Sequence, residues 1–166
     1  MIADRRHPNV VHADEVEPLV VERGQHRFHR RSFGATAGNR QLGGSLMELA
    51  PGAMSYPFHY HCANEEAIYV IAGTGTVRLG EKRVAVRAGD WIAMPVGPAH
   101  AHQMINNSDA PLVYLAIGTE HTCEVIGYPD SKKVAVMGGE SWDELWIREI
   151  KPAGETLDYW DGEPHA

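Results

Sequence analysis

The sequence predicts an all-β protein with a single domain, folded as an antiparallel double-sheet jelly-roll barrel. Its apolar runs are short, and 17 glycines and 10 prolines separate them into about eight strand-like segments. The 166 residues, of which 43% are hydrophobic and 22% charged, suit one globular core. Because we find no internal repeat, we expect one barrel rather than two.

The chain begins with residues 1–17, which are polar and lack periodicity, so we predict a flexible N-terminal arm. The domain itself is expected over residues 18–150. Strand-like pieces follow at 19–21 and 25–33, the second of them basic, and residues 34–44 read as a loop. A further strand over 45–49 leads to a turn at Pro51-Gly52.

The second half of the barrel begins with a predicted hairpin, formed by residues 76–79 and 83–86 around Gly80-Glu81-Lys82. Strands are also expected at 91–94, 111–117 and 133–137. Ser141-Trp142-Asp143-Glu144 fits a capping box, which predicts a short amphipathic C-terminal helix over residues 142–148. An acidic tail, 151–166, ends the chain.

Composition excludes some classes of function. The formal net charge is -7 and no basic cluster exceeds three residues, which argues against a nucleic-acid partner. No segment has the length and hydropathy of a membrane span, and no apolar run follows Arg5-Arg6 as a secretory signal requires. Two cysteines are too few for a disulfide framework, so a reduced, cytoplasmic location is expected.

Two histidines stand two residues apart in an extended segment, His59-Tyr60-His61. Side chains alternate along a strand, so both imidazoles point to the same face, where a divalent metal can join them. Glu66 follows at an odd separation and would face away in an unbroken strand. Residues 62–65 therefore have to interrupt the alternation, and their small and Asn residues are typical of a turn.

A second stretch, GDWIAMPVGPAHAHQMIN, runs from Gly89 to Asn106 and contains His100 and His102. These two also share strand parity, and either can turn toward the first pair. Imidazole and carboxylate side chains from two hairpins would form a ligand set for zinc, iron, manganese or nickel.

These residues resemble the cupin superfamily. Its first motif is Gly, five residues, His-x-His, three or four residues, Glu, six residues, Gly; here the spacing fits downstream of His59 and has one extra residue after Gly52. Its second motif is Gly, five residues, Pro-x-Gly, two residues, His, three residues, Asn, and Gly89, Pro95 and Gly97 fit. The motifs together cover residues 52–106, and the resemblance implies a double-stranded β-helix.

The resemblance leaves two choices to make. Counting from Gly97 selects His100, whereas counting back from Asn106 selects His102. We prefer His102, because an insertion is absorbed more easily in the Gly-Pro loop than by a shift of the next strand's register. Glu65 competes with Glu66, and the spacing to Gly73 favours Glu66. The implied ligands of one metal ion per chain are His59, His61, Glu66 and His102.

Four protein ligands would leave one or two positions open, which is a catalytic arrangement. The motifs are surrounded by apolar candidates for a substrate pocket: Met47, Tyr56, Met94, Met104 and Tyr114. No Lys or Arg lies within the motif strands to bind a phosphate. We therefore expect a metalloenzyme with dioxygenase-like chemistry on a small, partly apolar, chelating substrate. The alternatives are a sugar or sugar-phosphate isomerase and a non-catalytic ligand-binding module; the resemblance also implies a homodimer.

Overall fold

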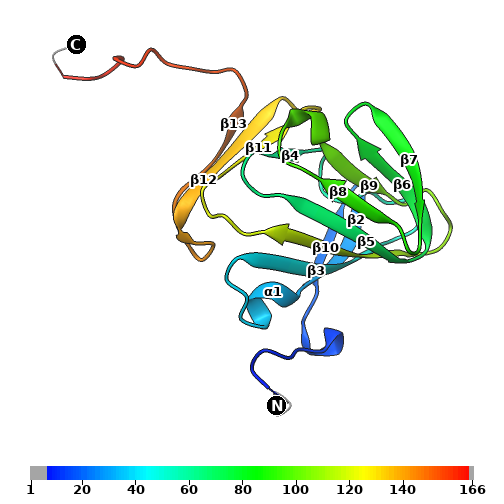
Figure 1. The fold of residues 1–166 in the computed structure, drawn as a ribbon. Coiled ribbons are helices and arrows are strands. Elements are labelled where there is room, and N and C mark those ends of the chain that lie inside the picture. The colour runs from blue at the N-terminus through cyan, green and yellow to red at the C-terminus, as the bar shows by residue number, and fades with distance from the viewer. Residues whose placement is uncertain (1–6, 165–166) are drawn as a thin grey trace.

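The fold was analysed in a computed structural model, which describes residues 7–164. Thirteen strands account for most of this region (Figure 1). The first half of the chain contains β1 (Leu19–Arg23), β2 (His26–Ser32), β3 (Leu42–Leu49), β4 (Tyr60–His61), β5 (Glu66–Ala72), β6 (Thr74–Leu79) and β7 (Lys82–Arg87). The second half contains β8 (Trp91–Met94), β9 (His102–Ile105), β10 (Leu112–Thr119), β11 (Glu124–Tyr128), β12 (Lys133–Ser141) and β13 (Glu144–Pro152). One α-helical turn, α1 (Phe33–Thr36), and two 3-10 turns, η1 (Ala13–Glu15) and η2 (Pro98–His100), complete the described elements.

The strands form a barrel of two layers. One layer is a six-stranded sheet with the order β1-β2-β3-β10-β5-β8. The other consists of a three-stranded sheet, β7-β6-β9, and a four-stranded sheet, β13-β12-β11-β4. An antiparallel bridge between His59 and His102 connects these two smaller sheets. All pairs of named strands are antiparallel, so the predicted all-β double-sheet architecture is confirmed.

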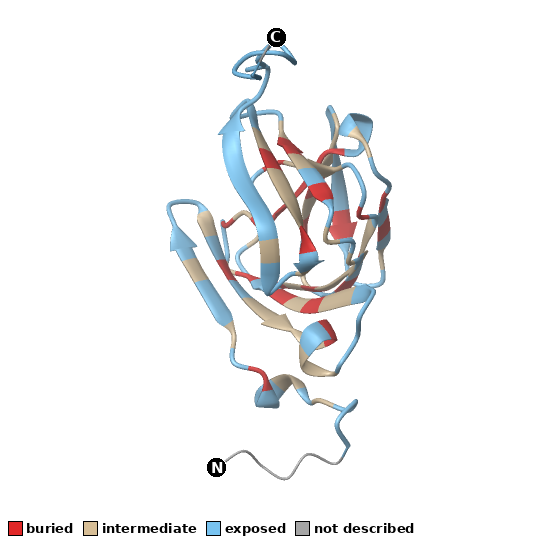
Figure 2. Ribbon diagram, turned by 90° about the vertical axis from the view of Figure 1, so that its left-hand side faces the viewer, coloured by how far each residue is buried: buried red, intermediate tan, exposed pale blue. Residues whose placement is uncertain are grey.

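Apolar side chains from both layers form one core inside the barrel. Figure 2 marks the buried positions of the strands in red. Leu49, Val70 and Leu112 are completely buried there, and Val77 is 1% exposed. Alternate residues of β3, β5, β6 and β8 face this interior, as a period of two requires. The core therefore fixes the register of the strands that carry the two motifs.

The predicted C-terminal helix over 142–148 is wrong. Ser141 pairs with Glu144 at the end of a tight hairpin, and β13 then runs antiparallel to β12. The Ser141 hydroxyl accepts a hydrogen bond from the Glu144 backbone N–H at 3.1 Å, which is the bond expected of a helix N-cap. Here the same bond closes a hairpin turn, because the residues that follow pair with β12 instead of coiling.

Smaller differences concern the ends of elements. The predicted loop over 34–44 contains the last residues of α1, and β3 begins at Leu42 instead of residue 45. Strand β13 continues to Pro152, after which the chain leads away from the barrel (Figure 1). The domain limits at residues 17 and 150 stay a prediction, and residues 1–6 and 165–166 lie outside the described part. Among the described residues, no helix has the length and apolarity needed to cross a membrane.

Candidate metal centre

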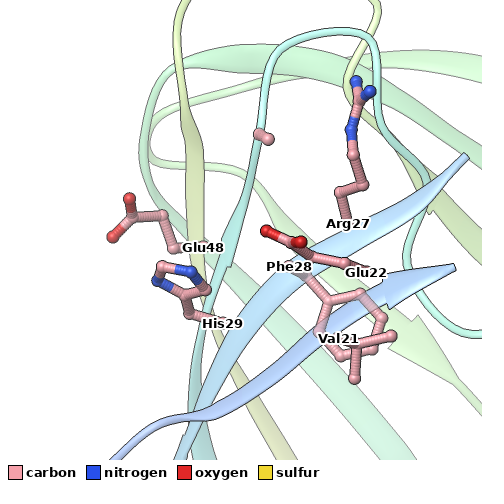
Figure 3. Close-up of a pocket in the computed structure, with 7 residues that line it drawn as sticks. Val21, Glu22, Arg27, Phe28, His29 and Glu48 are labelled. Atoms are coloured by element: carbon pink, nitrogen blue, oxygen red, sulfur yellow. The ribbon is translucent and has the colours of Figure 1, made fainter.

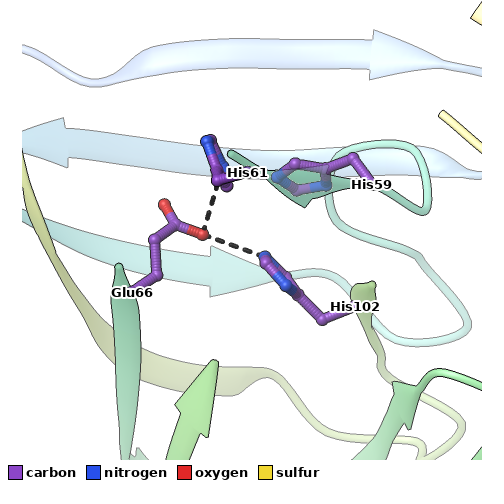
Figure 4. Close-up of side chains that lie close together, drawn as sticks. All are labelled: His59, His61, Glu66 and His102. Carbon is purple, nitrogen blue, oxygen red and sulfur yellow. Dashed lines mark hydrogen bonds and ion pairs between the residues drawn. The ribbon is translucent and has the colours of Figure 1, made fainter. Parts of the chain in front are cut away.

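Three strands and the segment before one of them bring four candidate ligands together (Figure 4). His61 lies on β4, Glu66 is the first residue of β5, and His102 is the first residue of β9. His59 precedes β4 and exchanges two backbone hydrogen bonds with His102, of 3.2 and 2.7 Å. These two bonds hold the motifs together although the residues are distant in the sequence.

The four side chains direct one potential ligand atom each toward a common point. These atoms all lie within 4.8 Å of one another. One carboxylate oxygen of Glu66, Oε2, lies 2.9 Å from His102 Nε2 and 3.5 Å from His61 Nε2. Ligands about 2.0–2.2 Å from a common ion lie about 3–4 Å from each other, so small side-chain adjustments suffice to hold one.

Each histidine uses its other ring nitrogen, Nδ1, in a hydrogen bond to an oxygen acceptor. The acceptors are the Pro57 carbonyl at 2.7 Å from His59, a Glu124 carboxylate oxygen at 3.2 Å from His61, and the His100 carbonyl at 3.1 Å from His102. Carbonyl and carboxylate oxygens only accept, so each of these contacts places a proton on Nδ1. In His59 and His61 this arrangement leaves the Nε2 lone pair for a metal ion, whereas His102 Nε2 lies in a hydrogen bond to Glu66 Oε2, which a bound metal would replace.

The charge states also suit a metal. Burial, with the nearby charges of His102 and His61, lowers the pKa of His59 to about 4, so its imidazole is neutral at pH 7. Burial by itself would raise the pKa of Glu66. The hydrogen bond from His102 and the neighbouring histidine charges outweigh burial and lower that pKa to about 2, so the carboxylate is ionised.

A buried nitrogen atom without a hydrogen bond gives independent support for a metal ion at this site. His61 Nε2 is buried and makes no hydrogen bond. Such atoms are rare in folded proteins, because an unsatisfied buried polar group destabilises the fold. A metal ion at the common point would satisfy this nitrogen, so the residues present fit a divalent metal.

The alternatives to the preferred ligands lie elsewhere. His100 is exposed in η2, which takes up the two extra residues of the second motif, and only its carbonyl oxygen contacts His102. Glu65 is exposed, and its backbone pairs with Thr119 on β10. The turn expected between His61 and Glu66 is present, since β4 ends at His61 and β5 begins at Glu66.

The predicted pocket residues lie inside the barrel. The side chains of Met47, Met94, Met104 and Tyr114 belong to the buried core and are at most 3% exposed, whereas Tyr56 packs against the core from its edge. Burial raises the pKa of the Tyr114 phenol, and the charge of Glu66 adds to this rise. These residues therefore lie in or against the core, and their contact with a substrate stays a prediction.

Two cavities in the described part of the chain lie outside this centre. One, of about 110 Å³, is lined by residues of β1, β2 and the end of β3: Val21, Glu22, Arg27, Phe28, His29, Glu48 and Ala50 (Figure 3). The other, of about 650 Å³, lies beside β6 and β7 and includes Thr74, Arg87 and Asn107. Neither contains any of the four candidate ligands.

Sequence reasoning missed two residues of β11 that border the centre. Glu124 contacts His61 across 63 positions of sequence. The ring of Tyr128 stacks on His59, with 6.1 Å between the ring centroids. Both lie beyond the two motifs, and no periodicity or spacing in the sequence connects them with the histidines, because only the pairing of β11 with β4 brings them close.

Comparison with known proteins agrees with this geometry. Residues 45–118 match the family model described as Cupin domain. A sugar phosphate isomerase of the cupin superfamily from Silicibacter pomeroyi has a TM-score of 0.75 and 25% identity, covering 90% of this chain and 97% of that chain. A proposed sugar phosphate isomerase from Acidithiobacillus ferrooxidans has a TM-score of 0.73 and 27% identity, covering 87% of this chain and 92% of that one.

A relative found by sequence is the Polyketide synthase CurC of Streptomyces cyaneus. It is 29% identical over 113 residues, which are 67% of this chain and 70% of that protein. The match to the family model, the double-sheet barrel and the structural similarity over nine-tenths of the chain together identify residues 45–118 as a cupin domain.

Proposed function

We propose that this protein is a divalent-metal-dependent enzyme whose small-molecule substrate binds at the metal. The observation that carries the proposal is the convergence of one potential ligand atom from each of three histidines and Glu66 within 4.8 Å. Four ligands leave one or two positions of a five- or six-coordinate ion for a substrate. The side chains of His61 and Glu66 are 13% and 32% exposed, so a substrate can reach the cluster from solvent.

Isomerisation of a sugar or sugar phosphate is the reaction we favour. The ion would polarise a carbonyl beside a hydroxyl group and so acidify the carbon between them. This preference is supported by the two structures named sugar phosphate isomerase, because each covers about nine-tenths of both chains. It reverses the order expected from the sequence, where dioxygenase-like chemistry came first.

One cation near the centre supports a substrate with an anionic group. Lys133 Nζ lies 5.5 Å from the ring centroid of Tyr128, which stacks on His59. Lys133 is thus one side chain away from a candidate ligand, where a phosphate would be attracted. Arg78, which lies over the ring of Phe58, is instead paired with the Asp130 carboxylate at 2.6 and 3.0 Å.

A second candidate is dioxygenase-like chemistry on a partly apolar chelating substrate. The three methionines of the barrel interior, Met47, Met94 and Met104, favour this alternative, since they would give the substrate an apolar floor. A third candidate function is that of a non-catalytic ligand-binding module, which would bind the metal but convert no substrate.

We further propose a homodimer. Strands β1 and β13 form edges of their sheets, and β13 exposes Trp146 and Ile150, which are 76% and 63% accessible. Exposed apolar side chains on an unpaired edge favour association with a second copy. Light scattering at micromolar concentration should give twice the mass of the chain, and a monomeric mass would contradict the proposal.

Metal analysis and two activity assays test the function. Elemental mass spectrometry of untagged protein should find about one divalent metal per chain. The loaded protein is then incubated with sugar phosphates in D2O, where isomerisation incorporates deuterium at the carbon next to the carbonyl, detected by NMR. Oxygen uptake with chelating substrates is measured in parallel and would favour the second candidate.

A matched pair of variants identifies the carboxylate ligand. Glu66→Gln should lose the metal and any activity, because its neutral amide is a poor ligand and its charge no longer stabilises the ion. Glu65→Gln, the adjacent exposed carboxylate, should keep both. Wild-type protein that takes up no metal even under reducing conditions would refute the proposed function.

A further inference from the structure

Glu124, the first residue of β11, is a buried charge outside the ligand cluster. Its side chain is 0% exposed. Burial of a carboxylate is costly unless the group is fully hydrogen-bonded, so its partners indicate its role.

All hydrogen-bond partners of Glu124 but one belong to the segment 61–64. The exception is the backbone N–H of Val125, the next residue in the chain. Oε1 accepts from the backbone N–H groups of Cys62 and Ala63, both at 3.0 Å, and from that of Val125 at 2.8 Å. Oε2 accepts from the Asn64 N–H at 2.8 Å and from His61 Nδ1 at 3.2 Å. Burial opposes ionisation, but the hydrogen bonds from Ala63, Asn64 and Cys62 lower the pKa of Glu124.

We propose that Glu124 is a positioning residue that holds His61 in the tautomer and ring orientation needed for metal binding. This inference rests on the metal site proposed above. Four backbone N–H groups donate to the two oxygens of Glu124, so the carboxyl group acts as an acceptor and its contact with Nδ1 places the imidazole proton there. The opposite nitrogen, Nε2, is then left unprotonated and directed at the cluster, where it makes no hydrogen bond.

The same carboxylate fastens the loop that follows His61. Three consecutive N–H groups, from Cys62 to Asn64, point to one side chain, which fixes the interruption between β4 and β5. One group thus connects the orientation of His61 with the loop that resets the alternation before Glu66.

The test is metal affinity in Glu124→Gln. The amide oxygen in place of Oε1 still accepts from Cys62 and Ala63, whereas the NH2 group in place of Oε2 loses the bond from the Asn64 N–H, donates to His61 Nδ1 and favours the proton on Nε2. Titration with Co2+, followed by its visible absorption, and competition with Zn2+ should show Kd raised about 10–100-fold. An unchanged Kd for both metals would overturn the inference and leave the proposed metal site intact.

Asn64→Ala separates positioning of the ring from stability of the loop. The Asn64 side chain accepts from the His121 N–H at 2.6 Å and from the Thr119 hydroxyl at 3.2 Å, and it donates to the His121 carbonyl at 3.0 Å. None of these bonds involves His61. We expect a lower melting temperature in this variant, with a much smaller change in Kd than in Glu124→Gln. Equal losses of affinity in the two variants would mean that Glu124 acts only through the loop.

A measurement on the wild-type protein does not depend on the folding of any variant. Long-range 1H–15N spectra of the Zn2+-loaded protein should show His61 with its proton on Nδ1 and its metal bond at Nε2. The reverse arrangement would overturn the inference. Wild-type protein that binds neither Co2+ nor Zn2+ would refute the proposed function and this inference together.

Discussion

Replacing His102 with alanine should remove the metal, whereas the same change at His100 should not. His102 Nε2 is one of the four clustered atoms and lies 2.9 Å from Glu66 Oε2. His100, two residues earlier, contributes only its carbonyl oxygen, which accepts from His102 Nδ1. Alanine at position 100 keeps that carbonyl, so the two variants differ in whether a ligand is lost.

The size of the effect follows from the linkage between binding and unfolding. A metal at 100 times its Kd adds about 2.7 kcal/mol to the free energy of unfolding. For a domain of this length each kcal/mol raises the melting temperature by about 2–4 °C, so Zn2+ should raise it by about 5–11 °C. If the variant binds about 100-fold more weakly, the same Zn2+ concentration contributes only about 0.4 kcal/mol, or about 1–2 °C.

Differential scanning calorimetry with excess Zn2+ and with EDTA gives both melting temperatures. Wild-type protein and His100→Ala should show the full rise, and His102→Ala almost none. A full rise in His102→Ala together with its loss in His100→Ala would mean that the second motif is anchored at the earlier histidine, and would refute the assignment of ligands.

Two further predictions concern the barrel. Leu112→Ala, at a completely buried core position, should lower the free energy of unfolding, measured in urea, by about 2–5 kcal/mol. Its control, Leu157→Ala in the exposed tail, should change that free energy by less than about 0.5 kcal/mol. Equal effects of the two variants would contradict the assigned core. Gly127→Ala should cost about 1–3 kcal/mol in thermal or urea unfolding, because a Cβ there would overlap the ring of Tyr60 where β11 pairs with β4. Gly138→Ala is its control, since no atom lies within 4 Å of a Cβ at that position, and a similar loss there would remove this explanation.

Local signals predicted most of the barrel. Strand β8 was predicted over the residues that form it, and the β6–β7 hairpin differs from the structure only in its end residues. Short apolar runs bounded by turn residues leave few alternatives, so period and turn chemistry determine such elements.

The C-terminal hairpin shows where local signals fail. The capping-box pattern at Ser141 predicts a local hydrogen bond, and that bond is present. Whether the next residues coil or extend depends on a partner strand, and β12 supplies one from the preceding residues. Tertiary pairing thus overrides local preference, as it commonly does for short amphipathic segments.

For the candidate site, the sequence by itself determined the chemistry of the ligands, because His-x-His and a nearby glutamate are readable from spacing alone. The tertiary structure decided which histidine of the second pair joins the cluster, since the two have the same parity and η2 removes His100 from it. It alone revealed Glu124 and Tyr128, which reach His61 and His59 only through the pairing of β11 with β4. Spacing along a chain specifies what lies on one strand, whereas contacts between distant strands depend on how the whole barrel closes.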